Sequence, residues 1–258
     1  MTSKTFFDSI PIELHAHKRK VQFFIEEIRS YSSMKGVSNS DLNILEIGCG
    51  NGTVVSLPLA ELGYKVTGVD LHKPSIELAK AKNIFENAQF LCQDLSEFSA
   101  NQLYNVVILS DILEHVEAPD ELMALAACYT EQDGIILISI PNGYGPSELE
   151  RKFLEFFRID KFLYWLKSYI SSVLGRKSDA YNSDSGHIQF FRMKEIVGLI
   201  EGADLSLKKK GKGSLFGGGI TYPIGTLFPW IVEPSLRLAQ KLPFSIVSTW
   251  YFSCERKK

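Results

Sequence analysis

The chain has 258 residues, of which 45% are hydrophobic and 22% are charged. This is an ordinary globular composition, and the chain is long enough to bury one sizeable core. Its 28 Lys and Arg residues against 30 Asp and Glu residues give a formal net charge of −2. This nearly equal number of positive and negative charges argues against a surface that binds nucleic acid as a whole. We therefore expect a protein that acts on small molecules and not on nucleic acid.

The cysteines and the N-terminus indicate the compartment. Cys49, Cys92, Cys128 and Cys254 lie far apart, with no CxxC pair and no zinc-like spacing, which favours a reducing environment. The first 20 residues contain no continuous apolar stretch of the kind found in secretory signals. Residues 213–232 carry no charge and reach the length of a membrane span, but five glycines and two prolines argue against a spanning helix. These features predict a cytoplasmic protein.

The predicted elements begin with an amphipathic helix over residues 13–33, which would serve as a lid or as a packing helix. From residue 44 to residue 140, short apolar strands alternate with helices. The predicted strands are 44–47, 65–69, 89–92, 106–109 and 134–140, and the predicted helices are 53–62, 74–81 and one from about residue 119. This alternation predicts a parallel sheet covered on both faces, with ligands bound at the carboxyl ends of the strands.

The alternating pattern weakens after residue 141. A long helical stretch at 147–175 is rich in aromatic residues, and a helix near 193–201 with strands near 205–209 and 247–254 would complete the sheet. We predict an α/β, Rossmann-like fold with a seven-stranded, mostly parallel sheet, helices on both faces and a helical, aromatic cap insertion. The predicted single domain consists of an N-terminal helical lid (1–40), a ligand-binding core (41–145), the cap insertion (146–190) and a completion of the sheet with a second apolar insertion (191–258).

The strongest motif follows the first predicted strand, which ends at Glu46 and runs into three glycines spaced two residues apart, Gly48, Gly50 and Gly52. Glycine lets the backbone turn tightly and lets a ligand approach without a Cβ in the way. A dinucleotide fingerprint needs a further glycine where this sequence has Thr53, which argues against a nicotinamide enzyme.

Acids also end the next two predicted strands. Asp70 is placed to accept hydrogen bonds from both ribose hydroxyls of a nucleoside. Asp94 is placed to accept a hydrogen bond from the exocyclic amine of adenine. Three acids at three consecutive strand ends predict one nucleoside pocket. The alternative is that these residues are only turn glycines and helix-capping acids.

With ExGxGxG, the second-strand acid and the third-strand Gln-Asp in order over residues 42–140, the sequence resembles the class I S-adenosylmethionine-dependent methyltransferases. The resemblance implies that the core 41–145 binds S-adenosylmethionine, with the glycines at the amino-acid part of the cofactor, Asp70 at the ribose and Asp94 at the adenine. The cofactor-binding residues that it implies are Glu46, Gly48, Cys49, Gly50, Gly52, Asp70, Leu71, Asp94, Leu95 and Ser110.

A finer resemblance begins at residues 110–116, with the sequence Ser-Asp-Ile-Leu-Glu-His-Val, and continues after the fifth strand with Ser-Ile-Pro-Asn at 139–142. These residues are similar to those of the O-methyltransferases of ubiquinone biosynthesis and related bacterial methyltransferases. The resemblance implies that Ser110 contacts the cofactor and that Asp111, Glu114 and His115 hold a divalent cation such as Mg²⁺, although Asp111 stands where the ubiquinone enzymes carry Glu. Alternatively, Asp111 caps a helix with Glu114 at its third position, an arrangement that needs no chemistry.

Transfer to a hydroxyl group requires a base, because the acceptor must lose a proton. His115 is the first candidate and His187 the second, with Asp111 and Glu114 completing the predicted catalytic set. We predict O-methylation of a small molecule or of a lipid- or sugar-linked intermediate. An N- or C-methyltransferase, a nucleotide-dependent oxidoreductase and a catalytically silent cofactor-binding protein stay open as alternatives on a similar fold.

The stretch from Leu149 to Leu174 mixes aromatic with basic residues. Such a helix suits the wall of a pocket for an apolar acceptor, and equally a peripheral contact with the inner face of a membrane. Either role fits a lipid-linked substrate.

Overall fold

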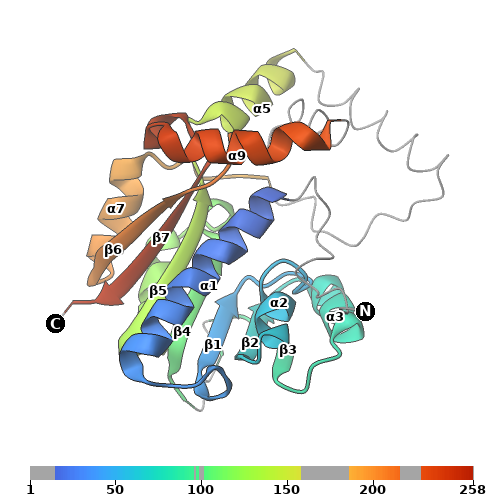
Figure 1. Cartoon of the computed structure of the whole chain (residues 1–258), viewed down its shortest axis with the longest axis vertical. Helices are drawn as coiled ribbons and strands as arrows, with labels where there is room; N and C mark the ends of the chain where they lie inside the picture. The colour runs from blue at the N-terminus through green and yellow to red at the C-terminus, as the bar shows by residue number, and fades with distance from the viewer. Residues whose placement is uncertain (1–14, 96, 99–101, 158–185, 216–227, 258) are drawn as a thin grey trace.

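The computed structural model describes residues 15–95, 97–98, 102–157, 186–215 and 228–257, and within them a single sheet in the order β3-β2-β1-β4-β5-β7-β6 (Figure 1). The strands are β1 (Asn43–Ile47), β2 (Lys65–Asp70), β3 (Ala88–Cys92), β4 (Tyr104–Ser110), β5 (Thr130–Pro141), β6 (Leu205–Lys212) and β7 (Thr249–Arg256). Strands β1 to β5 pair in parallel, and β7 pairs antiparallel with both β5 and β6. The predicted seven-stranded, mostly parallel α/β fold is confirmed.

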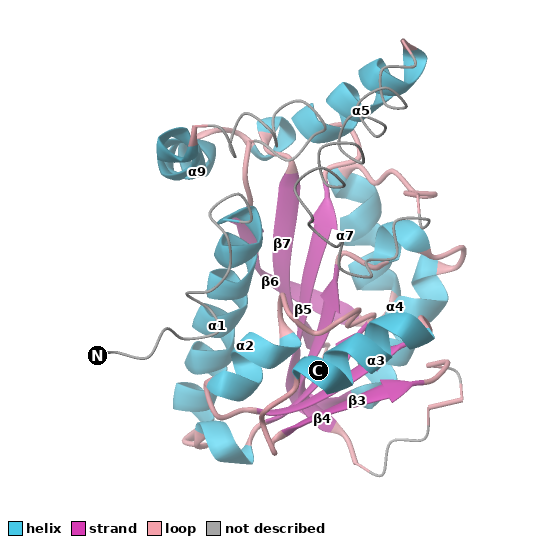
Figure 2. Ribbon diagram, turned by 90° about the vertical axis from the view of Figure 1, so that its right-hand side faces the viewer, coloured by secondary structure: helices cyan, strands magenta, loops and turns pink. Residues whose placement is uncertain are grey.

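Both faces of the sheet are buried, because side chains alternate along each strand. In β4, Val106 and Ile108 face a core shared with α1 (His15–Lys35) and α2 (Ser56–Glu61). Val107 and Leu109 face the other core, shared with α4 (Pro119–Tyr129) and α7 (Met193–Gly202). Figure 2 shows these two helix layers on opposite sides of the strands. The near-continuous apolar runs of the sequence are therefore explained by burial on both faces.

The remaining helices lie at the ends of the sheet. Helix α3 (Lys73–Lys82) packs beside β2 and β3, while α5 (Pro146–Phe156) and α9 (Val232–Lys241) lie beyond the carboxyl end of β5 (Figure 1). Short 3-10 turns cover Asn39–Asp41 (η3), Leu113–His115 (η4), Pro229–Ile231 (η5) and Phe244–Ile246 (η6). Among the described residues, no helix is long and apolar enough to cross a bilayer.

The strand order places the predicted site at the switch point of the sheet. Strand β1 lies between β2 and β4, so the chain leaves β1 in one direction toward β2 and β3 and later returns to pair β4 on the other side. Loops that leave the carboxyl ends of such neighbouring strands diverge and open a crevice for ligands. The glycine motif follows β1 at this crevice.

The clearest differences from the predicted elements lie at β5, α5 and α9. Strand β5 begins at Thr130, directly after α4 ends, rather than at residue 134. Helix α5 ends at Phe156, and residues 158–185 of the predicted cap lie outside the described residues. Helix α9 (Val232–Lys241) is an element that the sequence does not predict, and it lies in the second apolar insertion, after the glycine-rich stretch.

Candidate active site

The loop after β1 is built on glycine conformations. Gly48, Gly50 and Gly52 have φ values of 72°, 54° and 70°, which side chains rarely adopt. At Gly52 a Cβ would lie 2.7 Å from the ring of Phe90, so packing excludes a side chain. At Gly50 nothing lies within 4 Å of an added Cβ, so the space above this residue is open. The loop therefore presents bare backbone to open space, which fits the approach of a cofactor.

Asp70 ties this loop to the end of β2. Its Oδ2 accepts a hydrogen bond from the Gly50 amide and its Oδ1 one from the His72 amide, both at 2.7 Å. Each carboxylate oxygen has a second lone pair, so Asp70 can still accept hydrogen bonds from ribose hydroxyls while it binds the two backbone amides. The next residue, Leu71, is 69% exposed and offers apolar surface at the same strand end.

Glu46 lies beneath the glycine loop and is 3% exposed. The hydroxyl of Ser56 donates a hydrogen bond to its Oε2. Burial raises the pKa of Glu46 to about 8, although this hydrogen bond and the nearby Lys20 counteract the rise. At neutral pH the carboxyl group therefore carries a proton in most molecules of the ligand-free protein.

The other predicted cofactor residues occupy neighbouring positions. Asp94 is exposed just after β3, and the end of β3 is tied to β2 by the Gln93 amide, which donates to the Asp70 carbonyl at 3.2 Å. Leu95 is buried in the core beside α4, and Cys49 is buried under the glycine loop. Ser110 is the last residue of β4, so the predicted set lies on the carboxyl ends of four adjacent strands.

Asp111 turns the chain immediately after β4, with a φ of 53°. Its Oδ2 lies 2.5 Å from Nζ of Lys20 on α1, and its Oδ1 accepts a hydrogen bond from the Ser139 hydroxyl at 2.7 Å. Burial alone would raise the pKa of Asp111, but the ammonium of Lys20 outweighs it and holds this pKa below its ordinary value. The helix-capping alternative for Asp111 is wrong, because residue 112 caps the 3-10 turn and its side chain makes no capping hydrogen bond.

A second group of side chains lies one turn further along the chain. Glu114, His115 and His187 each offer one ligand atom, and these atoms lie within 4.8 Å of one another. Glu114 is 2% exposed, and neither of its carboxylate oxygens has a hydrogen-bond partner among the described residues. Burial, reinforced by the charge of Asp111, raises the pKa of Glu114 well above its ordinary value. A buried carboxyl group without partners is costly, and a cation between these three side chains would satisfy it.

This group differs from the predicted cation site in one member. Asp111 was expected beside Glu114 and His115, but both of its oxygens are engaged by Lys20 and Ser139. His187 joins the group instead, because the amides of Ile188 and Gln189 donate to the main-chain carbonyl of Glu114 at 2.9 and 3.1 Å and fix the segment around residue 187 over η4.

Both imidazoles are oriented through Nδ1. Nδ1 of His115 lies 3.3 Å from the carbonyl oxygen of Gly186, which can only accept, so this nitrogen donates. Nδ1 of His187 lies 2.6 Å from Oε1 of Glu148 on α5, and Arg151 donates to the other oxygen of that carboxylate at 2.9 Å. Although burial alone would raise it, these two hydrogen bonds hold the pKa of Glu148 below its ordinary value, so the group is ionised and accepts the proton of Nδ1.

Sequence reasoning missed Lys20 and Glu148. Lys20 is 4% exposed and shares the helix face of Phe24, so a lysine within an apolar stripe was the one available signal. Glu148 stands 39 residues before its histidine, and nothing in its local sequence marks it.

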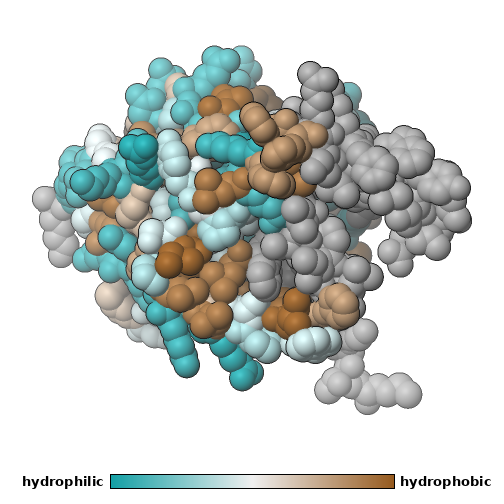
Figure 3. Space-filling model, turned by 90° about the horizontal axis from the view of Figure 1, so that it is seen from above, coloured by the Kyte–Doolittle hydropathy of each residue, from teal (hydrophilic) through white to brown (hydrophobic). Residues whose placement is uncertain are grey.

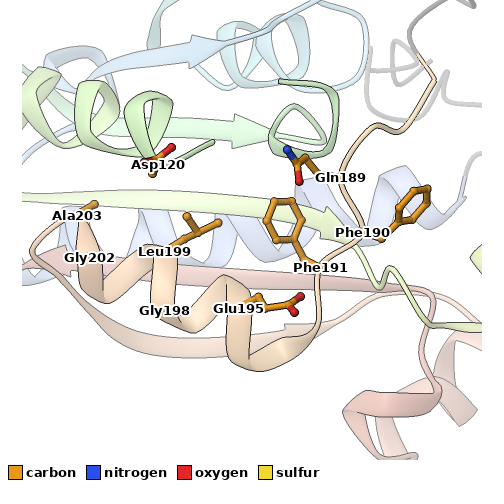
Figure 4. Close-up of a pocket in the computed structure, with 9 residues that line it drawn as sticks. All are labelled: Asp120, Gln189, Phe190, Phe191, Glu195, Gly198, Leu199, Gly202 and Ala203. Carbon is orange, nitrogen blue, oxygen red and sulfur yellow. The ribbon is translucent and has the colours of Figure 1, made fainter. Parts of the chain in front are cut away.

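A pocket of about 710 Å³ lies beside the segment that follows His187 (Figure 4). Asp120 at the start of α4 contributes to its lining, and the other lining residues come from the 189–191 segment and from α7. It contains none of the predicted cofactor residues, so its size does not make it the cofactor site.

Comparison with known proteins supports one family. A family model described as "Methyltransferase domain" matches residues 15–210. The ubiquinone biosynthesis O-methyltransferase of Rickettsia canadensis is 33% identical over 125 residues, which are 48% of this chain and 51% of that protein, so the chain spans about half the length of this relative. The likeness to solved structures shows the fold.

Two solved structures illustrate that likeness. The magnesium protoporphyrin IX methyltransferase of Synechocystis, solved with bound S-adenosylhomocysteine, has a TM-score of 0.55 and 16% identity, with 93% of this chain and 84% of that chain covered. The plantazolicin methyltransferase has a TM-score of 0.55 and 19% identity, with 98% and 88% covered. The family match covers most of the chain and separates it from nucleotide-dependent oxidoreductases on similar sheets. The chain therefore belongs to the methyltransferase-domain family.

Proposed function

We propose that this chain transfers the methyl group of S-adenosylmethionine to an oxygen atom of a small molecule, or of a lipid- or sugar-linked intermediate. The observation that carries the proposal is the buried Glu114 carboxyl group, which lacks a hydrogen-bond partner among the described residues and faces His115 and His187. A hydroxyl acceptor is the substrate that needs such a cluster, since methyl transfer itself requires only alignment with the sulfonium. The name of the Rickettsia relative, an O-methyltransferase, agrees with this choice.

The cofactor would lie over the glycine loop. We assign the open space above Gly50 to the amino-acid part of S-adenosylmethionine, Asp70 to the ribose, and Asp94 with the exposed Leu71 to the adenine. Glu46, Gly48, Gly52, Cys49, Leu95 and Ser110 would shape the pocket from below and from the end of β4. The sulfonium would then lie between the glycine loop and Asp111, on the side of β4 from which the histidine group is reached.

The histidine group would remove the proton of the acceptor. With Nδ1–H of His187 held by Glu148, the Nε2 lone pair of this imidazole is available, and the carboxylate stabilises the imidazolium that forms when the proton is taken. His115 is fixed in the same tautomer by the Gly186 carbonyl. Asp111 would act indirectly, by anchoring the turn between the cofactor edge and this group through Lys20.

We further propose that Glu114, His115 and His187 hold a divalent cation such as Mg²⁺. The donor set fits, because it combines a carboxylate that has no other partner among the described residues with two imidazoles whose second nitrogens are engaged. When bound, the cation would lower the pKa of an acceptor hydroxyl, so the histidine base described above is the alternative that applies to the protein without the cation.

The test measures transfer from isotopically labelled S-adenosylmethionine to a panel of phenols and sugar alcohols, with mass spectrometry of the products. We expect O-methylated products. His115→Ala should leave cofactor affinity nearly unchanged and slow transfer by about 10²-fold or more. Glu114→Gln should also slow transfer, whereas Glu117→Gln, three residues further on, should not. Products methylated only at nitrogen or carbon would overturn O-transfer, and full activity after exhaustive chelation would overturn the cation.

We also propose a peripheral contact with the inner face of the membrane. Apolar side chains gather on the end of the molecule that carries α5 and α9 (Figure 3). Phe156 and Trp230 there are 81% and 73% exposed, and Lys152, Arg237 and Lys241 lie on the same two helices. Large exposed aromatics beside basic residues suit an anionic lipid surface.

Sedimentation with vesicles of phosphatidylglycerol and phosphatidylcholine at low salt tests this contact. We expect binding that weakens in Phe156→Ser and Trp230→Ser. Ile84→Ser is the matched control, because Ile84 is 80% exposed but follows α3 at the opposite end of the strands. Failure of the wild-type protein to sediment would leave the 146–190 cap as a cover for the acceptor only.

A further inference from the structure

The side chain that fixes His187 comes from outside every recognised motif. Glu148 lies in the first turn of α5, which belongs to the cap and not to the sheet. It is 4% exposed, and its Oε1 lies 2.6 Å from Nδ1 of His187. Arg151, one turn further along the helix, donates to Oε2 at 2.9 Å. Both oxygens of a buried carboxylate are thus committed, one to the helix itself and one to the histidine.

We propose that Glu148 is a positioning residue, which holds the proton of His187 on Nδ1 and so presents Nε2 toward Glu114 and His115. The tautomer of an imidazole is set by the hydrogen bond that its other nitrogen makes. A carboxylate that accepts from Nδ1 leaves the lone pair on Nε2, the atom that either takes a proton or binds a cation. Without Glu148, the imidazole is free to carry its proton on Nε2, where it blocks both roles.

Each histidine of the group is held by a hydrogen bond at its Nδ1, and the two acceptors come from different elements. His115 is held by a main-chain carbonyl, that of Gly186, and His187 by a side chain. The rings meet edge to face, with centroids 5.0 Å apart, so a change in the tautomer of one alters what the other faces. Because the carbonyl cannot be removed by substitution and the carboxylate can, Glu148 is the point at which this arrangement can be tested.

Glu148 also makes the cap part of the site. The segment that carries His187 is already fixed to η4 by two hydrogen bonds to the Glu114 carbonyl. The contact with Glu148 adds a third element, α5, so the histidine group is complete only when α5 is docked. Arg151 reinforces this docking, since its guanidinium also lies 5.1 Å from the ring centroid of Phe190.

The experiment reads the tautomer directly, by long-range proton–nitrogen NMR of the full chain labelled with ¹⁵N-histidine at a pH where the imidazole is neutral. The sequence has five histidines, and the His187 signals are assigned by their loss in His187→Asn. We expect the Nδ1–H form in the wild-type protein and the Nε2–H form in Glu148→Leu. Glu148→Gln, whose amide oxygen still accepts a hydrogen bond, should retain the Nδ1–H form. Glu150→Leu makes the same substitution on the same helix outside the histidine group and should change nothing.

This inference rests on the proposed function only for what Nε2 then binds, so the two can fail separately. Calorimetric titration with Mg²⁺ or Mn²⁺ should show an affinity about 10- to 100-fold lower in Glu148→Leu than in the wild type, the usual cost of losing a partner that orients a ligand. If the wild-type protein binds neither ion but shows the Nδ1–H form, the cation is refuted and the role of Glu148 is supported. An Nε2–H form in the wild type, or an unchanged tautomer in folded Glu148→Leu, overturns the inference. Should Glu148→Leu fail to fold, the wild-type tautomer still decides.

Discussion

The buried carboxyl group of Glu46 predicts that cofactor binding expels a proton. Burial raises its pKa to about 8, so at pH 7 roughly 0.9 of the ligand-free molecules carry the proton. S-adenosylmethionine brings a positive sulfonium and an ammonium group, which our proposal places above Glu46. Nearby positive charge favours the ionised carboxylate. Binding at pH 7 should therefore release up to about 0.9 proton from this group, and at pH 9 only about 0.1.

Isothermal titration calorimetry measures this release. The binding enthalpy is determined in phosphate and in Tris, whose ionisation enthalpies differ, and the difference gives the number of protons exchanged. Glu46→Gln keeps the shape of the side chain and its hydrogen-bonding capacity toward Ser56 but cannot titrate, so it should lose this release. Equal proton release in the wild type and in Glu46→Gln at pH 7 would refute the reasoning.

The same shift predicts how stability depends on pH. The unfolded chain loses this proton near pH 4.5 and the folded chain near pH 8, so the folded state binds more protons between these values. Stability of the ligand-free protein should therefore fall as pH rises through this window, by at most roughly 3 kcal/mol at pH 7 from Glu46 alone. Urea unfolding of the wild type and of Glu46→Gln at pH 5 and pH 8 checks the sign. A stability difference that stays constant with pH would contradict it.

Two further predictions concern the elements around the cofactor loop. Lys20→Met should lower the free energy of unfolding by about 1–3 kcal/mol in urea, less than for a fully buried pair because the Asp111 side chain is 30% exposed, and Lys20→Arg should recover part of the loss. Gly50→Ala should cost about 1–2 kcal/mol of stability from its φ of 54° and should also weaken S-adenosylmethionine binding by calorimetry. Gly63→Ala, at a φ of 89° and with equally open space, should cost similar stability without weakening binding; equal affinity loss in both would remove Gly50 from the site.

The alternation of strands and helices from β1 to β5 was readable because each strand is apolar on both faces and each loop is marked by polar or glycine residues. Helix α9 was not, since it follows a glycine-rich apolar stretch and carries Pro234 in its first turn. Its amphipathic face, with Leu236 and Ala239 buried, becomes visible only once the sheet is in place.

The site residues likewise fall into those that local sequence predicts and those that depend on tertiary contacts. Glu46, the glycines and Asp70 lie on one local turn and the strand end next to it, so spacing was enough to predict that they come together. The partner of Asp111 lies 91 residues away and that of His187 lies 39 residues away, and their contacts depend on how α1 and α5 dock. The resemblance therefore implied Asp111 as a neighbour of Glu114 and His115 at the proposed cation site, whereas tertiary contact with Lys20 engages it elsewhere.

The residues proposed for the cofactor and the residues that orient the histidine group lie on different elements. The residues proposed for the cofactor come from the sheet and its loops, between β1 and the end of β4. The residues that orient the histidine group come from α5 and from the segment around residue 187, which are not part of the sheet. Exchange of the cap should therefore alter which hydroxyl is methylated while cofactor affinity stays within a few-fold, because the hydrogen bonds of Glu148 within the described part of the chain go to His187 and Arg151 and not to residues proposed for the cofactor. A cap exchange that abolished cofactor binding in a folded protein would show that the two halves are not separable.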